Sequence, residues 1–357
     1  MTPRGTLTPV RVAIIGATGY VGAELVRLLD RHPAVRIVGL VARGRDDEPV
    51  EHAHPHLAST GHVVDEEVPE ADAIFLALPH GASAGLVPDL VAGGAAIIDL
   101  GSDFRLRDPS DYPRWYGFEH PAPELLAAAV YGLPELHRSE LAALRTAERA
   151  VVASPGCYPT ATLLALAPLA RAGLIGDLVV DAKSGVSGAG REPRPDLTYA
   201  EVNESVRAYG VTGHRHVAEI EQELWRLAPG GDRSRNPGAR AVDFLPHLVP
   251  MSRGIFSSCH VRPTREVGQA ELDTLYGDAY GEELFVRVVS AAPATKHVLG
   301  SNQARVFARV DERTGRILAI GVVDNLVKGA AGQAIQAFNI VHGLPEAMGL
   351  EQLPLAP

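Results

Sequence analysis

The chain has 357 residues and a mass of 37.8 kDa, which is enough for two domains of ordinary size. Hydrophobic residues make up 46% and charged residues 21%, which is typical of a globular protein and not of a disordered or fibrous one. A net charge of −10 argues against a nucleic-acid partner, because phosphate binding needs a basic face. An anionic ligand would have to meet a local cluster of positive side chains.

The sequence predicts a cytoplasmic protein without a membrane partner. Its two cysteines cannot build a disulfide framework, so we expect a reducing compartment. The opening stretch "MTPRGTLTP" lacks the apolar core of a signal peptide, and apolar runs such as "ATLLALAPLA" are too short to span a bilayer.

The first half of the chain reads as apolar strands alternating with helices. Residues 10–15 form a β-branched apolar run, and after a glycine turn apolar residues recur at helical spacing. Further strands are expected at 35–42, 73–81 and 95–101, with a helix between the last two. This alternation predicts an α/β fold with a doubly wound parallel sheet of the Rossmann type.

The rhythm changes from about residue 177, where strands follow one another with few helices between them. We expect strands at 178–182, 242–250, 255–263 and 284–291, then a hairpin over 304–323 and a helix in 324–343 that packs on the first domain. The predicted second domain is α+β with a mostly antiparallel sheet. The expected boundaries are 1–153 plus 325–357 for the first domain and 154–324 for the second. Residues 229–240 read as a surface loop, whose order the sequence leaves open.

The glycine turn "GATGYVG" predicts a dinucleotide site. Glycines at such a turn let the backbone approach a pyrophosphate, and the following helix start offers unpaired N–H groups to it. A purely structural tight turn is the alternative. We expect cofactor contacts from the turn and the helix start, at Gly16, Thr18, Gly19, Tyr20, Val21 and Gly22.

The end of the second strand favours NADP over NAD. No acidic residue follows this strand to bind a ribose 2′-OH. Arg43 occupies that position, with Arg45 close by, and an arginine there suits a 2′-phosphate. Two solvated arginines on a loop are the alternative. An extended short-chain dehydrogenase is excluded, because none of the nine tyrosines has a lysine four residues later.

Cys157, in "SPGCYPT", is the predicted nucleophile. An Ala- and Leu-rich helix is expected to start within a residue or two of it, and a helix N-terminus favours the thiolate form. A small apolar residue at a helix start is the alternative. Cys259 lies in the middle of a predicted strand, where we expect it to be inert. A thiolate beside a nicotinamide cofactor suggests that an acyl group forms a thioester, which a hydride then reduces to an aldehyde.

Such chemistry needs a general acid–base, and "GHRHVAEIEQEL" supplies His214 and His216 just before an amphipathic helix, with Glu219 and Glu221 after them. We expect no metal at this pair, because no third ligand is evident nearby. The run "HAHPH" (residues 52–56) is interpreted as a loop of solvated or capping histidines rather than a zinc site.

Nine motifs occur in order across nearly the whole chain: "GATGYVGAEL", "LALPHG", "DFR", "YGLPEL", "PGCYPT", "KSGVSGAGR", "GHRHVAEI", "RGI" and "DNLVKGAAGQA". Together they resemble the N-acetyl-γ-glutamyl-phosphate reductases of arginine biosynthesis, a family similar in fold and chemistry to aspartate-semialdehyde dehydrogenase and glyceraldehyde-3-phosphate dehydrogenase. One departure is Ala218, where the family usually has proline at a helix entry that does not require it.

The resemblance implies NADPH-dependent reduction of N-acetyl-L-glutamyl 5-phosphate to the 5-semialdehyde with release of phosphate, by a homodimer or homotetramer. It implies that Cys157 is the nucleophile and that a histidine of the "HRH" motif is the acid–base. We assign that role to His214 and a substrate contact to His216, although spacing cannot separate them.

The other motifs imply contacts with the anionic substrate and the cofactor. For Arg105 the alternative is an ion pair with Asp103 or Asp108. The alternative for the glycine-rich motif "KSGVSGAGR" is a surface turn, and for Asn325 it is a helix N-cap. The implied substrate-binding residues are Ser102, Arg105, Lys183, Arg191, His216 and Glu219. The implied cofactor contacts beyond the glycine turn are Arg43, Pro79, His80, Ser187, Gly188 and Asn325.

Two rival functions remain at this point. The homologous reductase of lysine biosynthesis acts on a carrier-linked aminoadipyl phosphate, but those enzymes usually carry Asn-Ala where this chain has Tyr158-Pro159. A non-catalytic NADP-binding sensor would be expected to lose the cysteine or both histidines, and this chain keeps all three.

Overall fold

The computed structural model describes residues 8–231 and 241–356. The chain forms two compact units. Unit 1 runs to Ser154 and takes in residues 331–351, and unit 2 comprises residues 155–330 and the end of the chain from Gln352. Residues 232–240 of the predicted surface loop lie outside the described residues.

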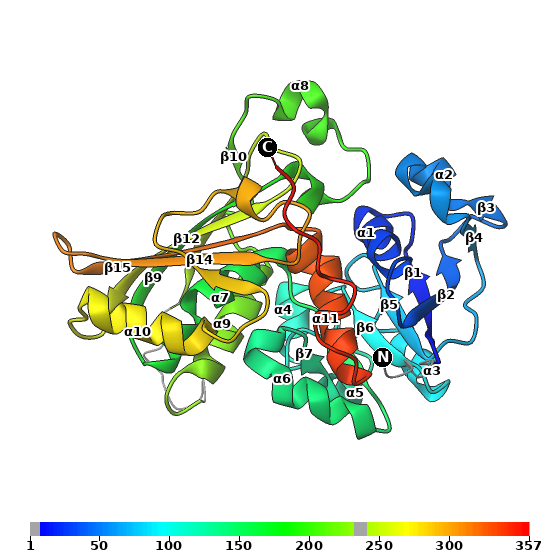
Figure 1. Ribbon diagram of the computed structural model, residues 1–357, viewed down its shortest axis with the longest axis horizontal. Coiled ribbons are helices and arrows are strands. Elements are labelled where there is room, and N and C mark those ends of the chain that lie inside the picture. The colour runs from blue at the N-terminus through cyan, green and yellow to red at the C-terminus, as the bar shows by residue number, and fades with distance from the viewer. Residues whose placement is uncertain (1–7, 232–240, 357) are drawn as a thin grey trace, which may run out of the picture. The chain divides into compact units, whose positions relative to one another are not determined.

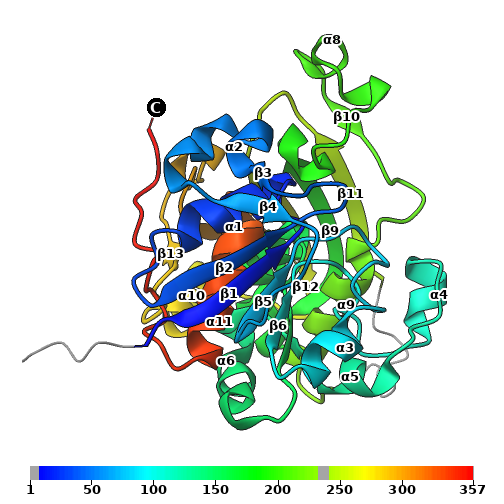
Figure 2. The ribbon, with the colours of Figure 1, turned by 90° about the vertical axis from the view of Figure 1, so that its right-hand side faces the viewer.

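Unit 1 is built on an eight-stranded sheet in the order β3-β4-β2-β1-β5-β6-β8-β7. Figure 2 shows the part of this sheet from β3 to β6. Every pair is parallel except β3 with β4, so the predicted doubly wound parallel sheet is confirmed. The strands are β1 (Val10–Ile15), β2 (Val35–Val41), β3 (Glu48–Pro49), β4 (Val63–Asp65), β5 (Ala73–Leu76), β6 (Ala96–Asp99), β7 (Val130–Tyr131) and β8 (Val151–Ala153).

The strand order reverses direction at β1, since β2 lies on one side of it and β5 on the other. The loops after β1 and β5 therefore flank the topological switch point, where open α/β sheets bind their ligands. The helices of unit 1 are α1 (Tyr20–Leu29), α2 (Val50–Ala53), η1 (Pro55–Thr60), α3 (Val87–Ala92), α4 (Asp111–Trp115), α5 (Pro123–Ala128), α6 (Pro134–Ala143), η2 (Leu144–Thr146) and α11 (Gly332–Val341). Helix α11 packs on α6 and α1.

Unit 2 is built on a seven-stranded sheet in the order β10-β11-β9-β12-β15-β14-β13. Figure 1 shows β9, β10, β12, β14 and β15 of this sheet. It is mostly antiparallel, as predicted; only β9 with β11 and β13 with β14 run parallel. The strands are β9 (Ile175–Ser184), β10 (Arg207–Ala208), β11 (Asp243–Leu248), β12 (Ile255–Pro263), β13 (Val286–Val288), β14 (Ala304–Asp311) and β15 (Arg316–Val323). The helical elements are α7 (Cys157–Arg171), η3 (Val186–Ala189), η4 (Pro195–Leu197), α8 (Tyr199–Val202), α9 (His216–Leu227), α10 (Gln269–Tyr280), η6 (Thr295–His297) and the π-turn η7 (Val327–Ala331).

Helix α7 is the core of unit 2, and residues 158–170 of it are all buried. It lies so close to β15 that a Cβ on Gly321 would overlap the carbonyl oxygen of Ala161. Pro168 inside the helix has no N–H, so the carbonyl of Leu164 loses its helical partner. The hydroxyl of Tyr280 donates to that carbonyl at 2.6 Å, which satisfies it and ties α10 to α7.

Helix α7 covers one face of the sheet of unit 2, and on the other face Val298 packs on Ile320 and Val322. Along β12 the alternate residues Ile255, Ser257, Cys259 and Val261 are fully buried. Thr162 of α7 hydrogen-bonds to Ser257, which places α7 on that face. The residues between them on β12, such as Phe256 and Ser258, are partly exposed on the other face, here called the open face.

Two features of the fold differ from the expected division. Residues 325–330 and 352–357 group with unit 2, because Asn325 is bonded to Gly254 and the backbone N–H of Leu355 donates to Leu299. Strands β3, β4, β7 and β8 were not predicted, since strands of two or three residues are too short to show a period.

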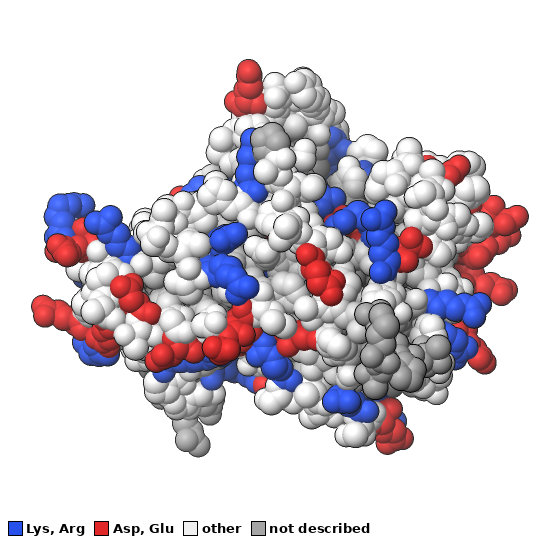
Figure 3. Space-filling view, in the orientation of Figure 1, with Lys and Arg blue, Asp and Glu red and all other residues white. Residues whose placement is uncertain are grey.

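The described residues contain no helix long and apolar enough to cross a membrane. On the face shown in Figure 3, acidic and basic side chains are interspersed.

Candidate functional site

The predicted nucleophile begins the buried helix of unit 2. Cys157 is the first residue of α7, and Gly156 precedes it in an extended conformation as the N-cap. The thiol forms no disulfide and is partly exposed. The first turn of a helix has N–H groups without helical acceptors, and these favour a negative charge on the sulfur. By contrast, Cys259 is fully buried in β12, and burial raises the pKa of its thiol to about 12.

Gly156 is the point at which the nucleophile and its polar neighbours meet. Its N–H donates to Oε2 of Glu219 at 3.1 Å, and Glu219 is fully buried in α9. The other carboxylate oxygen of Glu219 lies 3.9 Å from Nε2 of His216. A Cβ on residue 156 would overlap the His216 ring. Only glycine therefore lets His216 lie directly against the residue that precedes Cys157.

His214 is placed differently from His216. Its Nδ1 accepts the backbone N–H of His216 at 3.2 Å, and its ring packs within 6 Å of Tyr158, Tyr209 and Phe244. Burial lowers the pKa of His214 to about 4, and the neighbouring Arg215 lowers it further. His214 is therefore neutral near pH 7 and acts as a wall of the aromatic cluster beneath His216.

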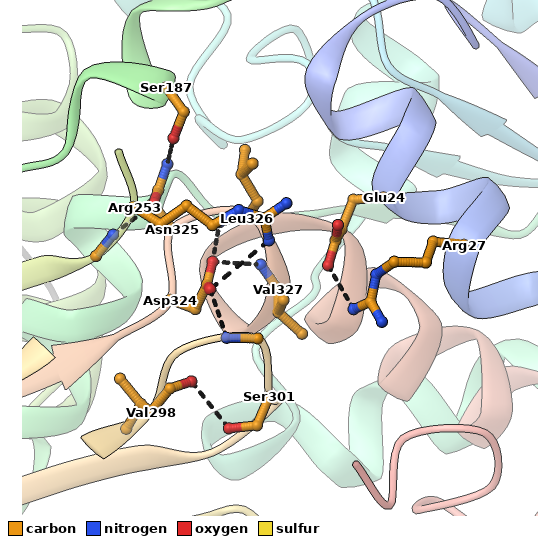
Figure 4. A network of polar contacts seen from close by, with 12 residues as sticks. Glu24, Arg27, Ser187, Arg253, Val298, Ser301, Asp324, Asn325, Leu326 and Val327 are labelled. Atoms are coloured by element: carbon orange, nitrogen blue, oxygen red, sulfur yellow. Dashed lines mark hydrogen bonds and ion pairs between the residues drawn. The ribbon is translucent and has the colours of Figure 1, made fainter. Parts of the chain in front are cut away.

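A second segment reaches Cys157 from the end of β15. A Cβ on Gly329 would come within 2.9 Å of the Cys157 Cβ, so the backbone at 329 packs directly on the cysteine. The buried carboxylate of Asp324 shapes this segment by accepting N–H groups of Leu326, Val327 and Gly300 (Figure 4). Arg253 lies 3.7 Å from the same carboxylate.

Three predicted cofactor residues of unit 2 lie together. Asn325 is buried, accepts the N–H of Gly254 at 2.8 Å and donates to the hydroxyl of Ser187 at 2.9 Å (Figure 4). Gly188 follows Ser187 in η3, where a Cβ would lie 3.8 Å from the Asn325 amide nitrogen. Asn325 thus joins two loops, and its side chain is not engaged as a helix N-cap.

The structure does not bring two predicted substrate residues to the thiol cluster. Lys183 alternates with Ser184 along β9, so it lies on the open face, paired with Asp181 at 2.6 Å. His247 also contacts Asp181, at 3.1 Å. Arg191 is exposed in the segment after η3.

The glycine turn of unit 1 has the shape that a pyrophosphate needs. Gly16 has φ +89°, and a Cβ there would overlap the carbonyl oxygen of Ala77 after β5. A Cβ on Gly22 would overlap the carbonyl oxygen of Gly16. A Cβ on Gly19 would meet only that oxygen, at 3.5 Å, so there is open space beside the start of α1. Thr18 lies between these glycines, with Tyr20 and Val21 in the first turn of α1. These residues fit the phosphates of a dinucleotide.

The two arginines after β2 differ in their surroundings. Arg43 is exposed two residues beyond the strand, whereas Arg45 contacts Glu48. Arg43 is thus the one presented to solvent.

The predicted phosphate-binding residues of unit 1 form a buried network after β6. Arg105 donates to the backbone carbonyls of Leu100 and Ser154. Ser102 is fully buried and donates to Asp103 at 3.1 Å.

This network supports the loop after β5. His80 is exposed on that loop, next to Pro79, and lies 2.7 Å from the Ser102 hydroxyl. Asp103 accepts N–H groups of Gly81, Ser83 and Ala84 from the same loop. We infer that Ser102 and Asp103 shape the loop and orient His80.

Several residues of these sites were not predicted. Tyr158, Tyr209 and Phe244 form the aromatic cluster around His214, and their meeting depends on folding over nearly 90 residues of sequence. His54 is not solvated: it is buried at the N-cap position of η1, and its ring bonds to the carbonyl of Thr18.

The fold and these sites define the class of protein. Residues 11–144 match the family described as "Semialdehyde dehydrogenase, NAD binding domain", and residues 157–325 match "Semialdehyde dehydrogenase, dimerisation domain". Two solved structures share the fold at low identity. Aspartate semialdehyde dehydrogenase II of Vibrio cholerae, complexed with ASA, has a TM-score of 0.69 at 19% identity, covering 94% of this chain and 98% of the other. The Candida albicans aspartate semialdehyde dehydrogenase with NADP has a TM-score of 0.68 at 16% identity, with the same coverage.

Two curated relatives are much closer in sequence, and both are named N-acetyl-gamma-glutamyl-phosphate reductase. The protein from Heliobacterium modesticaldum is 48% identical over 98% of this chain and 100% of its own length. The protein from Desulforudis audaxviator is 48% identical over 96% and 98%. The chain belongs to the N-acetyl-gamma-glutamyl-phosphate reductase family.

The partly buried, neutral state of His214 predicts that acid weakens the fold. Because its folded pKa of about 4 lies below the unfolded value of 6.5, the unfolded chain binds more protons between these values. The stability that neutral His214 provides is fully present above pH 6.5 and is lost as the pH falls toward 4. The phenylalanine in His214→Phe cannot be protonated. When the pH falls from 7 to 5, we expect the unfolding free energy of this variant to decrease by about 2 kcal/mol less than that of wild type.

Urea unfolding at the two pH values, followed by near-ultraviolet circular dichroism, measures this difference. Burial also lowers the pKa values of His32, His120 and His342, but these residues are present in both proteins and cancel in the comparison. Equal pH dependence in the two proteins would contradict the assignment of a neutral His214.

Proposed function

We propose that this chain catalyses the NADPH-dependent reduction of N-acetyl-L-glutamyl 5-phosphate to N-acetyl-L-glutamate 5-semialdehyde, with release of phosphate, in arginine biosynthesis. The observation that carries the proposal is the close approach of His216 to Gly156, beside a cysteine at the start of a buried helix. Family membership supports the choice of substrate.

In this mechanism Cys157 carries the acyl group. His216 takes the thiol proton, the thiolate sulfur attacks the acyl carbon, and a C–S bond forms as the C–O bond to phosphate breaks. The departing phosphate takes the electron pair and the proton. When bound, NADPH supplies the hydride that reduces the thioester to the aldehyde level. The C–S bond then breaks, the aldehyde leaves, and the thiolate recovers a proton through His216.

We assign the acid–base role to His216 and not, as the sequence suggested, to His214. The ring of His216 lies against the residue before the nucleophile, within reach of the Glu219 carboxylate. The ring of His214 is held in an aromatic cluster and its Nδ1 is occupied by the His216 N–H. A histidine whose pKa is about 4 is also a poor proton acceptor near neutral pH.

Glu219 acts in this proposal as a positioning residue rather than as a substrate ligand. It is fully buried, holds the Gly156 N–H and stands beside His216. A carboxylate in this place fixes the peptide that carries Cys157 and stabilises the protonated ring of His216.

We propose NADP as the cofactor in preference to NAD. The support is Arg43, which is exposed just beyond β2, where a 2′-phosphate needs a cation. The glycine turn would hold the pyrophosphate, and Ser187, Gly188 and Asn325 are proposed to contact the nicotinamide end.

The proposed reaction is tested by the phosphate-dependent reduction of NADP⁺ with N-acetyl-L-glutamate 5-semialdehyde. We expect Cys157→Ser to lower kcat by about a thousandfold or more and His216→Gln by about a hundredfold or more. His214→Gln is the matched control and should stay within about tenfold of wild type, because it supports the cluster and transfers no proton.

The outcomes separate the alternatives. Full activity of Cys157→Ser would refute the thioester, and a larger loss in His214→Gln than in His216→Gln would reverse the two roles. A preference for the longer N-acetyl-aminoadipate semialdehyde would move the chain to lysine biosynthesis. If the protein binds the cofactor but shows no turnover, the result would support the non-catalytic NADP-binding sensor.

We further propose that two copies of unit 2 pack through the open faces of their sheets, forming a homodimer that can pair into a tetramer. The description of residues 157–325 as a dimerisation domain supports association. Across the strands, Phe256 pairs with Val322, Phe307 with Ile320 and Arg309 with Leu318. The partly exposed apolar members of this face pack on a small core; they are Phe256, Phe307 and Leu318.

Sedimentation velocity tests this face with Ser258→Glu, which puts a charge among these apolar residues without removing a core side chain. Ser258 lies on the open face opposite Ile320. We expect the variant to sediment as a monomer at concentrations where wild type is associated. Thr274→Glu, exposed on α10, is the control and should associate like wild type. Association of Ser258→Glu equal to wild type would refute this interface.

A further inference from the structure

The histidine run "HAHPH" contains one buried member. His52 and His56 are exposed, whereas His54 is 4% exposed between α2 and η1. Its ring stacks edge-on against His56, with centroids 5.7 Å apart. Nothing in the reaction proposed above uses His54, although it lies in the connection that follows the Arg43 loop.

His54 reaches the glycine turn from 36 residues away in sequence. Its Nε2 lies 2.9 Å from the carbonyl oxygen of Thr18. A carbonyl only accepts, so Nε2 carries the hydrogen and donates it. The N–H of the same peptide unit, that of Gly19, donates to the Gly16 carbonyl at 3.1 Å. The peptide between Thr18 and Gly19 is therefore held at both ends.

This peptide sets the direction in which α1 begins. Gly19 is the N-cap, and the first intrahelical bond runs from Ala23 N–H to the Gly19 carbonyl at 2.9 Å. The N–H groups of residues 20–22 come before that bond, so they are the donors that a helix start offers to an anion. Rotation of the 18–19 peptide would turn these donors away from the space beside Gly19.

We propose that His54 is a positioning residue for the dinucleotide, which preorganises the glycine turn for the pyrophosphate by holding the Thr18 carbonyl. This inference rests on the proposed binding of NADP by unit 1. If His54 served only the packing of α2 and η1, its loss would weaken the binding of all ligands of unit 1 equally. If His54 positions the glycine turn, its loss weakens the binding of ligands that carry the pyrophosphate and leaves the binding of ligands that lack it unchanged.

The test compares His54→Leu, which fills the space without a donor, with His54→Gln, whose amide can donate to the same carbonyl. Titrations of protein fluorescence give Kd for NADPH and, by competition, for adenosine 2′-monophosphate, which has no pyrophosphate. We expect His54→Leu to raise the Kd of NADPH about tenfold, with Kd for adenosine 2′-monophosphate unchanged within about twofold. His54→Gln should recover most of the NADPH affinity. His52→Leu, exposed on α2, is the control and should bind like wild type.

Thermal unfolding shows whether each variant is folded; His54→Asn, whose amide is one methylene too short, replaces His54→Leu if the latter does not fold. An unchanged NADPH Kd in the non-donating variant, or equal weakening of both ligands, would overturn the positioning role. Equal losses in the donating and non-donating variants would also overturn it. Failure of the wild type to bind NADPH would instead refute the proposed cofactor, so the two failures are distinguishable.

Discussion

The missing side chain at Gly156 is the constraint on which the site of unit 2 depends. It lets the ring of His216 lie against the peptide that leads into Cys157, and its N–H is held by the buried Glu219. Two elements are thereby fixed with respect to each other, the start of α7 and the start of α9, which carries the Glu219 carboxylate. Because α7 is buried along almost its whole length, the cysteine has little freedom to move away from this arrangement.

The same device, a close backbone approach that only glycine permits, recurs beside Cys157 and at the glycine turn of unit 1. Gly329 packs on Cys157, and Gly16 packs on the loop after β5. Around these approaches, buried polar side chains hold backbone N–H and carbonyl groups. Asp324 holds the segment that contains Gly329, Asp103 holds the loop after β5, and His54 holds the glycine turn. Such buried polar groups carry a desolvation cost, so they are expected where precise geometry is needed.

Much of the fold could be predicted from local patterns. The strands at 10–15 and 255–263 and the helix that begins at Cys157 follow from apolar runs bounded by glycine and proline. The site could be predicted only in part. Alternation along β9 places Lys183 opposite to Ser184, but the sequence does not say which face is covered. The difference between His214 and His216 depends on an aromatic cluster assembled from distant segments. His54 is indistinguishable from its neighbours until the fold brings it to Thr18. NADP preference, the cytoplasmic location and the oligomer remain predictions.

The central claim is that Cys157 carries the acyl group. It is tested most directly by incubating the protein with N-acetyl-L-glutamate 5-semialdehyde and NADP⁺ in the absence of phosphate, followed by acid quenching, digestion and mass spectrometry. The account predicts a burst of NADPH equal to the enzyme sites, an N-acetylglutamyl group on the peptide that contains Cys157, and its release when phosphate is added. An enzyme that turns over with phosphate but shows no burst, or carries the acyl group on another residue, would contradict the account.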